Sequence, residues 1–305
     1  MDTASWMIGD VKLTRIVEMK AERFPHWGFR NLSLEDVRAQ AWMRPHFATE
    51  DGKLRSCIQS FVIETADRTI IVDTCVGNDK ARQNESWNDL QTSFLDELAA
   101  AGYPPEGIDT VLCTHLHVDH VGWNTRLVDG NWIPTFANAK YLFGRFEWEH
   151  WSQEAGDKRN GEITPEVADD VMQQSVVNAD SIQPVIDAGL HELVEPYHQI
   201  CEGISLFPTP GHSPGHVSVS IKSGTEQAVI TGDMMHSPIQ CSLPHVASNF
   251  DYDTKQAEAT RREFLSQHAD GPVKVFGTHF RHPTWGRIVS NGDSWVFDVK
   301  DSDAC

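Results

Sequence analysis

Residues 114–123 read Thr-His-Leu-His-Val-Asp-His-Val-Gly-Trp and bring together, within six positions, His115, His117, Asp119 and His120. The run before them, residues 108–113, is apolar and rich in β-branched side chains, so it predicts a buried strand. The cluster therefore follows the carboxyl end of a core strand, where α/β proteins commonly carry their sites. Neutral imidazoles and carboxylates are ordinary zinc ligands. Because the first two histidines alternate while the last two residues lie beyond a turn, the spacing favours two metal ions over one.

This pattern, His-x-His-x-Asp-His, resembles the signature of the metallo-β-lactamase-fold hydrolases. The resemblance continues along most of the chain, in the order that the family shows. The similar segments are Ile-Ile-Val-Asp-Thr at 70–74, Thr-Pro-Gly-His-Ser-Pro-Gly-His at 209–216, Thr-Gly-Asp at 231–233 and Gly-Thr-His at 277–279. An ordered set of motifs is far more specific than any one of them, so we expect a metal-dependent hydrolase.

The resemblance also implies which residues bind the two metal ions. The first ion would be bound by His115, His117 and His212. The second would be bound by Asp119, His120 and His279, with Asp233 bridging the two. Asp73 would support these ligands without binding a metal itself. We expect two zinc ions per chain, with manganese, cobalt or iron as alternatives.

Composition limits the classes of partner. The chain has 305 residues, of which 40% are hydrophobic, so it can bury a normal core. Its formal net charge is −19, from 44 acidic and 25 basic residues. Such a surface repels polyanions, which argues against nucleic acid and anionic membranes as partners. The expected partner is a small-molecule substrate, and a homodimer is an open alternative to a monomer.

The six cysteines are scattered without the Cys-x-x-Cys spacing of a zinc site and without the pattern of a disulfide framework. The first residues lack the basic and apolar regions of a signal peptide. No apolar run approaches the roughly 18 residues of a transmembrane helix. These features predict a cytoplasmic protein.

Strand and helix patterns recur along the chain as two halves, each of which ends its strands with expected metal ligands. This order predicts an α/β fold, an αββα sandwich of two mixed β-sheets flanked by helices. Strands are expected at 11–17, 58–64, 69–73, 139–143, 203–208, 217–221, 228–231 and 273–276. Helices are expected at 89–101, 145–151 and 253–267, the last capped by Asp253. We expect residues 1–305 to form a single domain.

Two segments depart from this regular pattern. Residues 20–50 carry several aromatic side chains among prolines and charges, and contain a helix start at Ser33. Three roles fit this segment: a lid over the site, a dimer contact or a satellite core. Residues 155–190 form a polar, partly helical insert.

The expected chemistry is hydrolysis by a metal-bound hydroxide. Zinc lowers the pKa of bound water to about 7, and a second ion about 3.5–4 Å away can polarise the substrate oxygen. Asp119 supplies an oxygen ligand to the second ion, and Asp233 can bridge both ions and handle the proton of the leaving group. No motif offers a serine or cysteine nucleophile, so we expect no covalent enzyme intermediate.

The core motifs do not select the substrate. Across the whole chain the pattern looks most like the quorum-quenching lactonases and their organophosphate-hydrolase relatives. A lactone or carboxylic ester, of the N-acyl homoserine lactone type, is the expected substrate. The alternatives are a phosphotriester or phosphodiester, a β-lactam and a thioester, while a metal-binding module is the alternative without catalysis.

Two residues near the motifs remain ambiguous. His236 stands three residues after Asp233, where lactonases of this superfamily commonly have a tyrosine that faces the substrate carbonyl. A histidine there can donate a hydrogen bond or a proton to the substrate, or it can instead hold Asp233. Trp123 either narrows the pocket beside the metals or packs against a helix.

Overall fold

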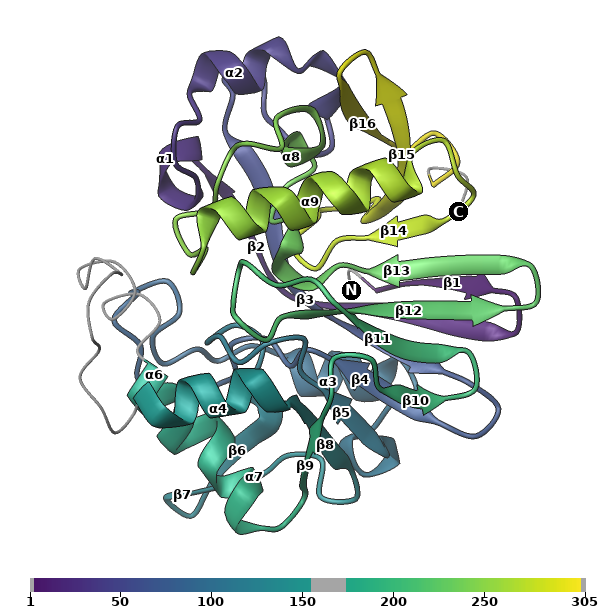
Figure 1. Ribbon diagram of the computed structural model, residues 1–305. Helices are drawn as coiled ribbons and strands as arrows, with labels where there is room; N and C mark the ends of the chain where they lie inside the picture. The colour runs from purple at the N-terminus through teal and green to yellow at the C-terminus, as the bar shows by residue number, and fades with distance from the viewer. Residues whose placement is uncertain (1–2, 155–173, 303–305) are drawn as a thin grey trace. The chain divides into compact units, whose positions relative to one another are not determined.

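The computed structural model describes residues 3–154 and 174–302 of the chain. The chain divides into two compact units. Unit 1 comprises Met1–Glu18 and Ile58–Pro196, and unit 2 comprises Met19–Cys57 and Tyr197–Cys305. Within the described residues, the strands form two seven-stranded sheets and one two-stranded hairpin, and Figure 1 labels the elements.

The first sheet is formed mainly by strands of unit 1. Two of its strands, β2 and β3, include residues assigned to both units. Its strands, in spatial order, are β1 (Ala4–Ile8), β2 (Val11–Arg23), β3 (Leu54–Glu64), β4 (Thr69–Val72), β5 (Thr110–Leu112), β8 (Lys140–Gly144) and β9 (His191–Val194). Strands β4, β5, β8 and β9 are parallel neighbours, and Val72 pairs with Leu112. Because parallel strands end at the same edge, the residues after Val72 and after Leu112 emerge close together.

Short helices follow these strands in unit 1. They are α3 (Phe94–Ala100), η2 (Pro105–Gly107), η3 (Gly122–Asn124), α4 (Arg145–Glu154), α6 (Gln174–Val177), the π-helical turn η4 (Asn178–Ile182) and α7 (Gln183–Asp187). The hairpin β6 (Thr125–Val128) and β7 (Asn131–Pro134) lies between η3 and β8. A buried ion pair fixes η4, because Arg82 contacts both carboxylate oxygens of Asp180 at 2.6 and 2.9 Å.

The second sheet lies within unit 2. Its strands, in spatial order, are β10 (Gln199–Cys201), β11 (Ile204–Pro208), β12 (Val217–Ser223), β13 (Glu226–Ile230), β14 (Lys274–Phe276), β15 (Trp285–Asn291) and β16 (Ser294–Asp298). Strands β13 and β14 are parallel, and Ile230 pairs with Phe276. The residues after β13 and after β14 therefore also emerge at one edge, and these include Asp233 and His279.

The helices of unit 2 are α1 (Pro25–Gly28), α2 (Leu34–Ala39), η1 (Ala41–Met43), η5 (Gly232–Met234), α8 (Ile239–Ser242) and α9 (Thr254–His268). In Figure 1 the long helix α9 runs beside strand β15 of its unit. Ser33 and Asp36 form a reciprocal capping box at the start of α2. Asp253 caps α9 by accepting hydrogen bonds from Lys255 N and Gln256 N.

Residues 20–50 divide into two parts within unit 2. Phe29, Val37, Met43 and Phe47 are buried and belong to one hydrophobic cluster with Met234, Met235, Phe264 and Phe280. By contrast, Phe24 is 47% exposed and Trp27 is 37% exposed. The later part of the segment is therefore core. The exposed aromatic residues around α1 remain open to a role as a wall, a lid or a subunit contact.

The predicted fold class is confirmed, since mixed sheets with flanking helices account for both units. The predicted strands and helices are present, but α3 begins at Phe94 and not at residue 89. Strands β15 and β16, which follow the predicted strand at 273–276, are not among the predicted strands. The part of the predicted insert at 155–173 lies outside the described residues. The single-domain assignment stays a prediction.

Within the described ranges, none of the helices combines the length and the apolar character that crossing a bilayer requires.

Candidate metal centre

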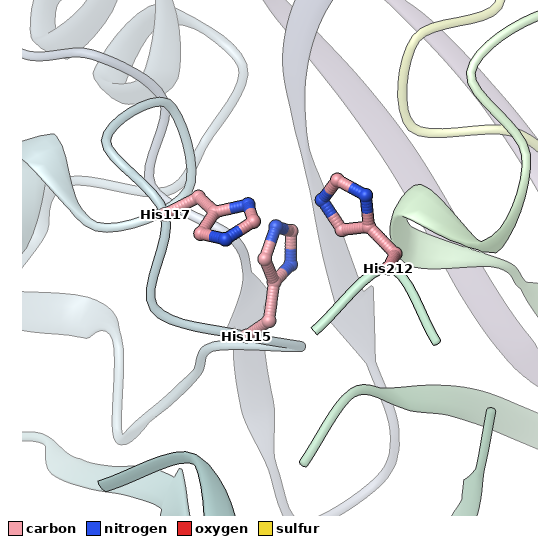
Figure 2. A group of neighbouring side chains, drawn as sticks. All are labelled: His115, His117 and His212. Atoms are coloured by element: carbon pink, nitrogen blue, oxygen red, sulfur yellow. The ribbon is translucent and has the colours of Figure 1, made fainter. Parts of the chain in front are cut away.

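The loop after β5 carries the first set of expected ligands, all of them in unit 1. Three of its imidazoles are at most 2% exposed, namely those of His115, His117 and His120. The rings of His115 and His117 approach edge to face with their centroids 4.4 Å apart, and Figure 2 shows both imidazoles. The ring of His120 lies 4.1 Å from that of His115. Asp119 completes this set, with its carboxylate 3.7 Å from His120 Nε2.

The backbone of Leu116, between the two alternate histidines, is held at both of its polar atoms. Its N–H donates to Glu147 Oε1 at 3.2 Å, and its carbonyl accepts from Gln174 Nε2 at 3.1 Å. Glu147 also accepts from the indole of Trp151 at 2.6 Å, and that indole packs edge-on against His117. Helices α4 and α6 thus fix the direction in which His115 and His117 point.

Asp73 supports His120, as the resemblance implied. It follows β4 with a positive φ of 56° and accepts hydrogen bonds from the N–H and the hydroxyl of Thr114. Its other neighbour is His120, whose Nδ1 lies 2.9 Å from the Asp73 carboxylate. A carboxylate at Nδ1 favours the tautomer with the proton on Nδ1, which leaves Nε2 as the atom that can bind a metal ion.

Trp123 packs against helix α3. It is 4% exposed, and its ring stacks on Phe94 of α3 at 5.8 Å. Its indole N–H donates to Glu18 Oε1 at 2.7 Å. Glu18 also accepts from the N–H groups of Val76 and Gly77, and burial raises the pKa of this carboxyl to about 7.

Unit 2 surrounds Asp233 with imidazoles. The Asp233 carboxylate lies 3.1 Å from His279 Nε2, 3.2 Å from His236 Nε2 and 3.5 Å from His212 Nε2. Ligand atoms of His212, Asp233 and His236 all lie within 4.8 Å of one another. Asp233 itself sits in η5, directly after Gly232, whose φ of 55° is open to glycine at little cost.

The other ring nitrogens of these histidines decide what this arrangement means. His279 Nδ1 donates to the backbone carbonyl of Cys57 at 2.8 Å, and His212 Nδ1 faces Asp251 Oδ1 at 3.1 Å. If the ring is neutral and its proton is on Nδ1, Nε2 carries a lone pair and can only accept a hydrogen bond. The Asp233 carboxylate that it faces is also an acceptor. Two acceptors at this distance repel each other unless a positive charge lies between them. The donor set therefore fits a metal cation.

His216, which is outside the expected ligand set, hydrogen-bonds to the backbone of Asp233. The N–H of Asp233 donates to His216 Nε2 at 2.9 Å, so the proton of neutral His216 is on Nδ1. Nδ1 in turn contacts Thr209 Oγ1 at 2.8 Å, and Thr209 contacts Ser218. His216 is thus a positioning residue for the backbone of Asp233.

The expected site residues fall into two sets. Unit 1 brings together Asp73, His115, His117, Asp119 and His120, and unit 2 brings together His212, Asp233, His236 and His279. Sequence reasoning missed the residues that hold these sets, namely Glu18, Glu147, Gln174, Asp251 and Arg261. A carboxylate inside an amphipathic helix such as α4 reads as part of a solvated face, so no local signal distinguishes Glu147.

Comparison with known proteins identifies related chains. The model of the Metallo-beta-lactamase superfamily matches residues 58–279. An N-acyl homoserine lactonase of Bacillus thuringiensis is 23% identical over 194 residues, which are 59% of this chain and 64% of that protein. The chain thus spans less than two thirds of that relative. A probable metallo-hydrolase, YybB, of Bacillus subtilis (strain 168) is 27% identical over 66% of this chain and 76% of the relative.

Solved structures of similar fold cover nearly the whole chain. The hydrolase AbOPH, described as a member of the beta lactamase superfamily, matches with a TM-score of 0.78 and 24% identity over 97% of both chains. AidC, a dizinc quorum-quenching lactonase in complex with a product, matches with a TM-score of 0.76 and 21% identity over 97% of this chain and 96% of that chain. At these identities the likeness concerns the fold.

Proposed function

This chain belongs to the metallo-beta-lactamase superfamily, and we propose that it is a dinuclear-zinc hydrolase that acts on a lactone or carboxylic ester. The observation that carries the proposal is the set of imidazole Nε2 atoms at 3.1 to 3.5 Å from the Asp233 carboxylate, in tautomers that a metal cation satisfies. The predicted class, a metal-dependent hydrolase, agrees with the family.

We propose that the two ligand sets hold one metal pair together. His115, His117 and His212 would bind one ion. Asp119, His120 and His279 would bind the other, and Asp233 would bridge both. The region that matches the family model, residues 58–279, contains every one of these ligands. Zinc is the proposed metal, because imidazole with carboxylate is its ordinary ligand set and a related structure is described as dizinc.

When bound, zinc lowers the pKa of a coordinated water to about 7 and polarises the substrate carbonyl. The residues of the chain then have separate tasks. Asp119, whose side chain is 12% exposed, would present a carboxylate oxygen to the second ion. Asp233 is held in place by His216 and can accept a proton and pass it to the leaving alkoxide.

His236 is the proposed hydrogen-bond donor to the substrate. Its side chain is 12% exposed, against 4% for Asp233. The centroid of its ring lies 6.3 Å from that of Phe29 and 6.4 Å from that of Phe250. A donor at this place stabilises the oxyanion that develops on the carbonyl. The distance of 3.2 Å to Asp233 also suits the other role considered for it, which is to hold that carboxylate.

The proposed substrate class is based on the names of the related proteins, and a panel of substrates tests it. Several relatives are named N-acyl homoserine lactonases, which favours an acyl homoserine lactone as the substrate. Metal-analysed protein should be assayed with acyl homoserine lactones, simple lactones, a phosphotriester, a thioester and a chromogenic cephalosporin. We expect the highest kcat/KM on a lactone, loss of activity on chelation and recovery with zinc. Faster turnover of another class would overturn the lactonase proposal.

The cellular setting and the assembly are also proposals. The described cysteines Cys57, Cys75, Cys113, Cys201 and Cys241 are all thiols without disulfides, which fits a reducing, cytoplasmic compartment. A homodimer stays an open expectation, which the mass of the protein in solution tests.

A further inference from the structure

Arg261 is a fully buried cation whose contacts lie in one folded loop of unit 2. It sits on α9 with 1% exposure. Its guanidinium donates to three backbone carbonyls, those of Met234 at 3.4 Å, Pro244 at 3.1 Å and Val246 at 3.1 Å. All three belong to residues 234–251, which we call the brace loop. A buried charge needs such partners, because water does not reach it.

The brace loop is cross-linked further by Gln240. The side-chain carbonyl of Gln240 accepts from the N–H of His236 at 2.8 Å, and its amide donates to the carbonyl of Val246 at 2.9 Å. Val246 O is therefore shared by Gln240 and Arg261. The backbone of His236 is therefore connected to the Arg261 guanidinium through Gln240 and the carbonyl of Val246.

Arg261 also reaches a metal ligand through one intermediate. Its Nη2 lies 3.8 Å from Asp251 Oδ2, and the other oxygen of Asp251 lies 3.1 Å from His212 Nδ1. Asp251 Oδ2 accepts in addition from the N–H of Ser248. Asp251, which contacts His212, is therefore itself in contact with Arg261 and with the backbone of Ser248 in the brace loop.

The brace loop supports the exposed aromatic residues around α1. Phe29 forms an isolated bridge with Ser248, Arg30 N donates to Ala247 O at 2.9 Å, and Asn249 N donates to Gly28 O at 3.0 Å. The ring of Trp27 packs edge-on against Phe250 at 5.8 Å. A shift of the brace loop therefore moves α1 and its aromatic side chains with it.

We propose that Arg261 is a positioning residue that couples the metal ligand His212 to the aromatic residues around α1. This inference rests on the proposed function insofar as it treats His212 as a metal ligand. The guanidinium suits the task because its donors are fixed in one plane and can serve carbonyls and a carboxylate at the same time. His212 and the aromatic residues around α1 then respond together to one side chain.

The test compares Arg261→Lys with Arg262→Gln. Lysine keeps the charge but lacks the planar set of donors. Arg262 is an exposed neighbour on the same helix that forms an ion pair with Glu258. Zinc affinity is measured by competition with a chelator, and hydrogen exchange is followed in peptides that cover 24–32 and 244–252. Neither readout depends on catalysis, so both remain valid if the lactonase proposal fails.

For Arg261→Lys we expect zinc affinity to fall by about 10-fold or more, within the range seen when outer partners of metal ligands are changed. Exchange should become faster in both peptides while the strands of the second sheet keep their protection. If a lactone is a substrate, KM should rise more for long acyl chains than for short ones. Arg262→Gln should match the wild type in every measurement.

Unchanged zinc affinity in Arg261→Lys, or faster exchange spread evenly over unit 2, would overturn the proposal, since a merely structural residue gives these results. Should the lysine variant not fold, Asp251→Asn decides, because it keeps the shape of the side chain and removes the charge between Arg261 and His212. Wild-type zinc affinity together with wild-type exchange at 24–32 in Asp251→Asn would likewise overturn it.

Discussion

The indole N–H of Trp123 donates to Glu18 at 2.7 Å, although these residues are 105 positions apart in the chain. Glu18 lies on β2, and Trp123 closely follows the loop that carries His115, His117 and His120. The same carboxylate accepts from Val76 and Gly77, in the segment after Asp73. One partly buried carboxyl group thus connects the two segments that follow Asp73 and His120.

This acid predicts a pH dependence of stability. Burial raises the pKa of Glu18 from 4.5 to about 7, so the folded protein holds this proton more tightly than the unfolded chain does. The resulting stabilisation is complete below about pH 4.5 and is lost as the pH rises through about 7. Glu18→Gln should therefore gain stability relative to the wild type between pH 5 and pH 8, as measured by urea unfolding. Parallel curves for both proteins would contradict this, and the exposed Glu22→Gln serves as the control.

The second prediction concerns Asp119. Asp119→Ala should empty the second metal position selectively, because His115, His117 and His212 remain for the first. We expect kcat to fall by at least about 10²-fold, since polarisation of the substrate and stabilisation of the oxyanion both weaken. Metal analysis and kinetics on the same preparation check this. Near-normal turnover with one ion bound would favour a mononuclear mechanism.

The aromatic residues around α1 give a prediction with two different outcomes. Trp27 is 37% exposed, so Trp27→Ala should leave the Tm nearly unchanged and raise KM for long-chain substrates more than for short ones. Phe29 is 7% exposed and lies in the core, so Phe29→Ala should lower the free energy of unfolding by about 3–5 kcal/mol. Equal effects of Trp27→Ala on all chain lengths would exclude a pocket wall, and a change in molecular mass would indicate a subunit contact.

The fourth prediction separates the two roles of His236. If His236 faces the substrate, His236→Phe should keep both metals and the fold but lower kcat by about 10- to 10³-fold. The pH–rate profile should lose one limb, because the titrating donor is gone. Loss of metal with normal turnover per remaining metal pair would instead show that His236 holds Asp233.

The sequence predicted the elements that carry strong local signals. Asp253 and Ser33 cap their helices as their patterns indicated, and the apolar runs before His115 and His279 are strands. It also named His212, His236 and His279, whose imidazoles lie around the Asp233 carboxylate, because each lies in or next to a short local motif.

Contacts between residues that lie far apart in the sequence could not be predicted from local sequence patterns. Glu147 holds Leu116 across 31 positions, and Arg261 reaches Met234 across 27. Neither residue differs locally from an ordinary charged residue of a solvated helix face, so only the packed structure shows that it is buried. Strand β16 was missed for a related reason: residues 294–298 are only partly buried and lack a clear alternation.

The central claim is that both ligand sets hold one pair of metal ions. The direct test is metal analysis of active, fully loaded protein, with protein concentration determined independently. We expect about two ions per chain, and chelation should remove the activity while zinc restores it. A single ion per chain in fully active protein would contradict the dinuclear site, whatever substrate the protein turns over.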